Sequence, residues 1–144
     1  MKDQVTMLFP ARSENEVLAR SFSAAYAARF DPTLRELEDI RTAVSEAVTN
    51  VVVHAYPGAE GMVRMVFSRS ESILVIEVAD DGVGIENVER AREAMYTSKP
   101  SMERSGLGFT VMEAFMDEVE VHSVPGQGTR VLLKKTIGRT KDTA

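Results

Sequence analysis

Residues 72–84 read SILVIEVADDGVG, an apolar segment that ends in two acids and two glycines. Residues 72–79 are dense in β-branched side chains, which is typical of a buried strand. Gly82 and Gly84 follow at alternate positions and allow a tight turn that a ligand can approach closely. We therefore expect Asp80 at the mouth of this turn, facing whatever binds there, although Asp-Gly pairs also mark ordinary turns.

A long helix is predicted over residues 33–56. Asp31-Pro32 offers an acid for its cap and a proline for its first position, and the pattern ends at Tyr56-Pro57-Gly58. Apolar residues recur at helical spacing and form one stripe, made of Leu37, Ile40, Val44, Ala47, Val48, Val51, Val52 and Ala55.

Glu46 and Asn50 lie on the opposite face of this helix, about 40° apart around its axis. Ala43 and Val53 share that face, so we expect something other than water to cover it. A carboxylate can take or orient the proton of an attacking hydroxyl, and an amide oxygen suits Mg²⁺ carried on phosphates. The alternative is that both are ordinary polar residues facing solvent.

Two further glycine segments follow. Residues 105–109 (SGLGF) open a helix predicted from Leu107 to Glu118, whose first turn would offer free N–H groups to phosphate oxygens. Residues 126–129 (GQGT) lie between two predicted strands, 119–124 and 130–137, where a plain hairpin is at least as good an interpretation as a ligand contact. With Asp80 able to accept a hydrogen bond from an adenine amino group, these segments together indicate an ATP site.

Composition sets limits on the function. The chain has 144 residues, no cysteine, two histidines and a net charge of −5. These values favour one domain, exclude disulfides and zinc thiolates, and argue against a nucleic-acid surface. No apolar run reaches the roughly 20 residues that span a bilayer, so we expect a cytoplasmic protein without membrane contact. P-loop, eukaryotic-type kinase and dinucleotide-fold motifs are absent.

The remaining elements are predicted more coarsely. A capping box at Ser13-Glu14-Asn15-Glu16 predicts the start of the first helix, and His54 either borders the pocket or packs as an ordinary histidine. Residues 95–105 lack periodicity and form either a lid over phosphates or a surface loop. The predicted elements are strand 3–10, helix 14–29, strands 61–68 and 72–79, and a short helix near 87–95.

The order E-x-x-x-N, D-x-G-x-G, G-x-G and G-T resembles the nucleotide-binding boxes of the GHKL superfamily. Within it, residues 45–50 (SEAVTN), 96–100 (YTSKP), 103–109 (ERSGLGF) and 112–117 (MEAFMD) resemble the anti-sigma factor serine kinases, above all those of a sporulation sigma factor of the sigma-F type. The likeness extends over residues 15–137.

This resemblance implies the Bergerat fold, in agreement with the predicted elements. We expect an α+β two-layer sandwich with a mixed, mainly antiparallel sheet and helices on one face. It also implies a single domain over residues 1–137 and a flexible tail over residues 138–144, and it favours a lid over residues 95–105.

The site residues implied by the resemblance divide by role. Glu46 would be the catalytic base, and Asn50 would hold Mg²⁺. Arg104 and Lys99 would supply positive charge to the γ-phosphate. The Arg104 guanidinium matches phosphate geometry better than the Lys99 ammonium does. The remaining nucleotide contacts would come from Asp80 at the adenine amino group, from Gly82, Gly84, Ser105, Gly106 and Gly108, and from Thr129 in support of Asp80.

The resemblance also implies partners. A homodimer would hold a sigma factor of the sigma-F type inactive and would phosphorylate an anti-anti-sigma factor on serine, with ATP/ADP and Mg²⁺ as cofactors. Three alternatives stay open: a sibling kinase that controls a stress-response sigma factor, an ATPase that passes phosphate to water, and a binding module without catalysis.

Overall fold

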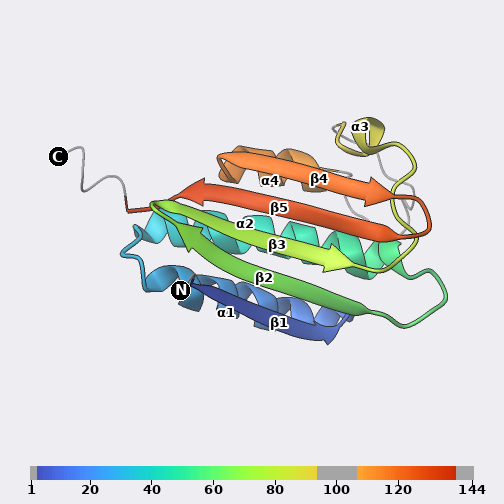
Figure 1. Ribbon diagram of the computed structural model, residues 1–144, viewed down its shortest axis with the longest axis horizontal. Coiled ribbons are helices and arrows are strands. Elements are labelled where there is room, and N and C mark those ends of the chain that lie inside the picture. The colour runs from blue at the N-terminus through green and yellow to red at the C-terminus, as the bar shows by residue number, and fades with distance from the viewer. Residues whose placement is uncertain (1–2, 94–106, 139–144) are drawn as a thin grey trace.

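A computed structural model describes residues 3–93 and 107–138, which form one sheet with helices packed on it (Figure 1). The five strands lie in the order β1-β2-β3-β5-β4, and every pairing between neighbours is antiparallel. The strands are β1 (Gln4–Pro10), β2 (Met62–Ser70), β3 (Ile73–Asp80), β4 (Glu118–Val124) and β5 (Gly128–Thr136).

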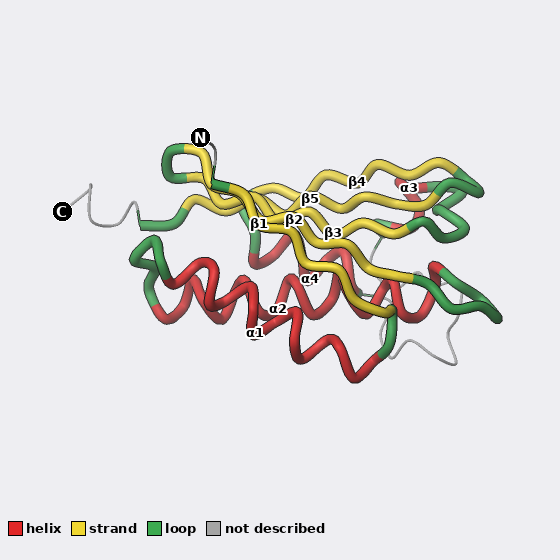
Figure 2. Tube along the Cα trace, turned by 60° about the horizontal axis from the view of Figure 1, so that its bottom comes forward, coloured by secondary structure: helices red, strands yellow, loops and turns green. Residues whose placement is uncertain are grey.

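Helices α1, α2 and α4 lie on one side of the sheet, as the separate red and yellow layers of Figure 2 show. The helical segments are η1 (Ser13–Asn15), α1 (Glu16–Ala28), α2 (Leu34–Asn50), η2 (Val51–Ala55, a π-helix), α3 (Val88–Ala91) and α4 (Gly108–Phe115). No helix in the described ranges is both long and apolar enough to cross a membrane.

The predicted α+β two-layer fold is confirmed. The sheet is antiparallel at all four described pairings, where a mixed, mainly antiparallel sheet is predicted from the sequence. Short connections join β2 to β3 and β4 to β5, and such hairpins require antiparallel neighbours, whereas parallel neighbours need a long crossover.

The core lies between the sheet and the helix layer. Alternate residues of β2, Val63, Met65 and Phe67, are fully buried, and so are Ile40 and Val44 of α2. The period of two on the strand and the helical spacing on α2 bring both apolar faces together. Most of the predicted stripe is buried, and Ala43 is buried as well, so α2 is covered over a wider arc than the stripe.

Both predicted helix caps are wrong, although each helix begins within two residues of its predicted start. The cap of α2 is Thr33, whose Oγ1 accepts from the Glu36 N–H at 3.0 Å while Glu36 Oε1 accepts from the Thr33 N–H at 2.8 Å. This reciprocal capping box satisfies two helix-end donors, so the helix begins beyond Pro32. At the other start, Ser13 opens a 3-10 turn, and the cap of α1 is Asn15, whose side chain donates to the Pro10 carbonyl instead of capping.

Candidate functional site

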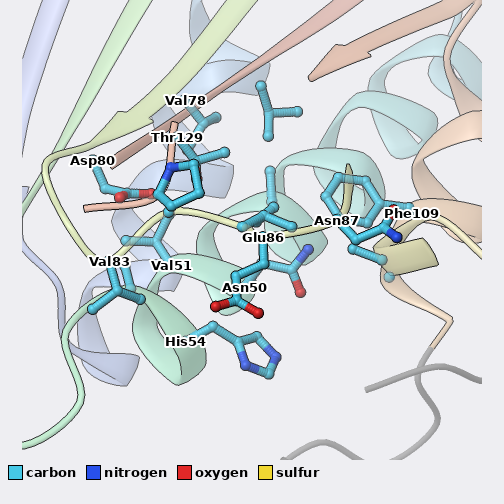
Figure 3. Close-up of a pocket in the computed structure, with 18 of the residues that line it drawn as sticks. Asn50, Val51, His54, Val78, Asp80, Val83, Glu86, Asn87, Phe109 and Thr129 are labelled. Carbon is cyan, nitrogen blue, oxygen red and sulfur yellow. The ribbon is translucent and has the colours of Figure 1, made fainter. Parts of the chain in front are cut away.

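A cavity of about 780 Å³ opens at one end of the molecule. Its walls come from α2 and η2, the ends of β3 and β5, the segment that leads into α3, the start of α4 and the β4–β5 turn. Figure 3 shows Asp80 and Val83 at the left of this cavity and Asn87 and Phe109 at the right. The polar side chains that line it are Asn50, His54, Asp80, Glu86, Asn87, Arg90 and Thr129.

Asp80 is the last residue of β3 and is half-buried. Its Oδ1 accepts a hydrogen bond from the Gly82 N–H at 2.8 Å. Burial raises the pKa of Asp80 above its ordinary value, backbone hydrogen bonds from Gly82 and Thr129 oppose the rise, and the Asp81 charge adds to it. An ionised carboxylate accepts several hydrogen bonds, so Asp80 can accept one from the amino group of a ligand.

The two glycines after Asp80 are required by close backbone contacts. A Cβ on Gly82 would lie 2.1 Å from the Ala55 carbonyl oxygen, and one on Gly84 would lie 2.4 Å from the Val124 carbonyl oxygen. Gly84 also has a φ of +75°, in the left-handed region that favours glycine. Gly84 lines the cavity, whereas Gly82 shapes it by packing against the end of η2.

Asn50 ends α2 and faces the cavity from the helix side. Gly108, the first residue of α4, lies directly beside it: a Cβ there would be 3.2 Å from Asn50 Oδ1. The start of α4 carries backbone N–H groups without helical partners, which suit anionic oxygens. Glu46 is half-buried one turn before Asn50, and the cavity lining among the described residues does not include it.

The β4–β5 turn closes the cavity beside Asp80. The predicted hairpin is confirmed, because Val124 pairs with Gly128 and Thr129 pairs with Ser123 in an antiparallel register. Thr129 lines the cavity, yet its hydroxyl bonds to the Ser123 hydroxyl at 2.9 Å. The support that it gives to Asp80 comes from its backbone N–H.

Four predicted site residues lie outside the described residues: Lys99, Arg104, Ser105 and Gly106. The predicted lid over residues 95–105 lies there as well. The structure therefore brings together Asn50, Asp80, Gly84, Gly108 and Thr129, with Gly82 directly behind them.

Several lining residues were not predicted. Asn87 caps α3 by accepting the Arg90 N–H at 3.0 Å, and both residues face the cavity. Phe109 is buried at its other wall. The sequence signal for Asn87 is an Asn three residues before Arg90 at a helix start, which predicts a cap but not a ligand site. His54 lines the cavity, as one of the two interpretations expected.

The lining combines an apolar floor with a few polar groups. Val51, Val78 and Val131 are buried residues of the lining, and Asp80 and Asn50 lie at separate positions in the cavity, as Figure 3 shows for these two. A flat heteroaromatic ring fits such a floor, and the Asp80 carboxylate is an acceptor for an exocyclic amino group. The residues present thus fit an adenine nucleotide: the Asp80 carboxylate could accept a hydrogen bond from the base, and Asn50 with the start of α4 could contact the phosphates.

The match to a family model defines the class of protein. Residues 9–135 match the model described as the histidine kinase-like ATPase domain. This range runs from the end of β1 to the end of β5 and includes every described residue of the cavity.

Curated relatives narrow the class. The anti-sigma F factor of Clostridium acetobutylicum is 46% identical over 142 residues, which are 99% of this chain and 99% of that protein. That of Clostridium perfringens is 52% identical over 136 residues, 94% of this chain and 97% of the relative. The chain therefore belongs to the anti-sigma F factor family of histidine kinase-like ATPase domains.

Two solved structures share the fold. The structure of the RsbU and RsbW domains of Rv1364c from Mycobacterium tuberculosis matches with a TM-score of 0.68 at 17% identity, over 94% of this chain and 32% of that one. Full-length ShkA in complex with AMPPNP matches with a TM-score of 0.59 at 20% identity, over 90% of this chain and 31% of that one. At 17% and 20% identity, these similarities show a shared fold only.

Proposed function

We propose that this chain is an anti-sigma factor and an ATP-dependent serine kinase. It sequesters a sporulation sigma factor of the sigma-F type and transfers the γ-phosphoryl group of ATP to a serine of an anti-anti-sigma factor. Relatives named anti-sigma F factor, about half identical over nearly the whole chain, support the sigma partner. The observation that carries the chemistry is that Asp80 and Asn50, from a strand and a helix, line one cavity.

The base end of the site lies at the end of β3. Asp80 accepts a hydrogen bond from the adenine amino group while its Oδ1 is held by the Gly82 N–H at 2.8 Å. Gly82 and Gly84 keep the turn close to η2 and β4, where no side chain would fit. The Thr129 backbone supports the Asp80 carboxylate from β5.

The phosphate end lies where α2 meets α4. Bound Mg²⁺-ATP supplies the phosphoryl group that is transferred. The Asn50 amide oxygen is a neutral ligand suited to the Mg²⁺, and the backbone at Gly108 approaches the phosphates. The resemblance also implies phosphate contacts for Ser105 and Gly106, which lie outside the described residues. Lys99 and Arg104 add positive charge there; both lie outside the described residues.

Glu46 acts at the acceptor hydroxyl. Its carboxylate takes the proton of the partner's serine as the serine oxygen bonds to the γ-phosphorus and the bond from that phosphorus to the ADP oxygen breaks. Glu46 lies on α2 one turn before Asn50, and this proximity supports a role at the phosphate end.

The transfer has a consequence for the partners. A phosphoserine carries about −1.5 to −2 charges, enough to disrupt a packed contact and release the anti-anti-sigma factor. ATP favours sigma capture and ADP favours its release, because the two nucleotides stabilise different states of the chain. We propose that the chain acts in the cytoplasm as a homodimer.

A transfer assay with radiolabelled γ-phosphate tests this function. The purified chain is given Mg²⁺-ATP with its own organism's sigma-F-type factor and anti-anti-sigma factor, and a serine-to-alanine form of the latter is the control. Label is expected on the serine form alone, and the sigma factor is expected to be retained more strongly with ATP than with ADP. Release of label as inorganic phosphate at the same rate without a partner would instead show an ATPase.

A further inference from the structure

The turn after Asp80 is fixed by three hydrogen bonds in succession. The Asp81 N–H donates to the Tyr56 hydroxyl at 2.9 Å, the Gly82 N–H donates to Asp80 Oδ1 at 2.8 Å, and the Val83 N–H donates to the Ala55 carbonyl at 2.8 Å. Two of these three acceptors belong to Ala55 and Tyr56, at the end of η2. The end of η2, which continues from Asn50, therefore holds the turn that follows Asp80.

The Tyr56 hydroxyl is itself held in place. It donates to the Met62 carbonyl at 2.6 Å, so its hydrogen is engaged and a lone pair remains for the Asp81 N–H. Met62 is the first residue of β2 and lies opposite Pro10 of β1 in the sheet. The ring packs against the core and over Gly61, where a Cβ would lie 2.2 Å from ring carbons.

We propose that Tyr56 is a positioning residue for adenine selection. The proposal rests on the proposed function, because it takes Asp80 as the acceptor of the adenine amino group. Tyr56 fixes the Asp81 amide, which fixes the turn in the form that lets Gly82 hold Asp80 Oδ1. The second carboxylate oxygen is then oriented toward the base. Without the hydroxyl, Asp80 stays in the cavity but loses its set orientation.

The variant Tyr56→Phe removes the hydroxyl and keeps the ring. The readout is the ratio of affinities for ADP and for purine riboside diphosphate, which has the same ring system without the 6-amino group. The intact chain is expected to prefer ADP by about 10- to 150-fold, the value of a hydrogen bond to a charged group. In Tyr56→Phe that ratio should fall by about 2- to 12-fold, the value of one lost hydrogen bond.

Two further variants complete the experiment. Tyr26→Phe removes a hydroxyl on α1 that does not line the cavity. In this variant the ratio of affinities for ADP and purine riboside diphosphate should equal that of the intact chain. Gly61→Ala keeps the Tyr56 hydroxyl but forces the ring to move, so its ratio should fall as in Tyr56→Phe. Gly61→Ala also serves as the test if Tyr56→Phe does not fold.

The outcomes separate this inference from the proposed function. An intact chain that binds both diphosphates equally would overturn the role of Asp80 and, with it, the role of Tyr56. If the intact chain prefers ADP and Tyr56→Phe keeps the same ratio, the inference alone is wrong. Equal losses of affinity for both diphosphates would show a structural role only and would also overturn it.

Discussion

Replacing Asp80 with asparagine changes the acceptor at the base end and little else. Asparagine has the same shape, and its Oδ1 can still accept the Gly82 N–H that Asp80 Oδ1 accepts at 2.8 Å. The other carboxylate oxygen becomes an amide nitrogen, which donates and therefore opposes the adenine amino group. A hydrogen bond to a charged group contributes about 1.5 to 3 kcal/mol, so ADP and ATP should both bind about 10- to 150-fold more weakly.

The same substitution should not lower the stability of the protein at neutral pH. Burial raises the folded-state pKa of Asp80 above its unfolded value, so the contribution of this group to stability is greatest below the unfolded pKa. That contribution is lost as the pH rises through the folded pKa, and at pH 7 the ionised group is the less favourable one to bury. Asparagine carries no such penalty, so the melting temperature of Asp80→Asn at pH 7 should equal or exceed that of the intact chain.

Isothermal titration calorimetry with ADP and ATP, together with thermal melts, checks both expectations. Asp81→Asn is the matched control, because it removes the neighbouring carboxylate, which is exposed and does not line the cavity. The control should bind both nucleotides within a few-fold of the intact chain. Unchanged affinity in Asp80→Asn would refute the assignment of Asp80, and a loss confined to ATP would place it at the phosphates instead.

Three other substitutions test separate parts of the account. Glu46→Gln should keep nucleotide affinity but slow phosphoryl transfer to the partner by about 10² to 10⁴ in single-turnover assays; a rate within a few-fold of the intact chain would exclude Glu46 as the base. Gly128→Ala should lower the free energy of unfolding in urea by about 1 to 3 kcal/mol or more, because φ is +99° and a Cβ would lie 2.1 Å from the Asp80 carbonyl oxygen. Lys135 is buried and its Nζ lies 3.4 Å from Asp39 Oδ2. Lys135→Met should therefore lower the free energy of unfolding in urea by about 1 to 3 kcal/mol. An unchanged free energy would show that water replaces the ammonium group as the partner of Asp39.

The strands and the main helix were predictable because their signals are local. Val63, Met65 and Phe67 alternate along β2, and the apolar spacing of α2 marks the side that packs on the sheet. The predicted cap of α2 is wrong because two cap signals lie side by side in the sequence. Asp31-Pro32 predicts one cap, but Thr33 and Glu36 form a two-way hydrogen-bonded box, which satisfies more donors.

The cavity was predictable only where its residues belong to recurring motifs. Asp80, Asn50 and Gly108 stand in such motifs, and the structure brings them to one cavity. The hydrogen bond between Tyr56 and Asp81 joins residues 25 positions apart and leaves no periodic signal. Phe109 is likewise placed by the packing of α4 on α2, which sequence spacing alone does not set.

A crystal structure of the chain with Mg²⁺ and a non-hydrolysable ATP analogue tests the central claim most directly. It should show the adenine amino group within hydrogen-bond distance of the Asp80 carboxylate and the metal on the Asn50 amide oxygen, with the base resting on Val51, Val78 and Val131. A nucleotide bound elsewhere on the molecule, or this cavity empty at a saturating concentration of the analogue, would contradict the account.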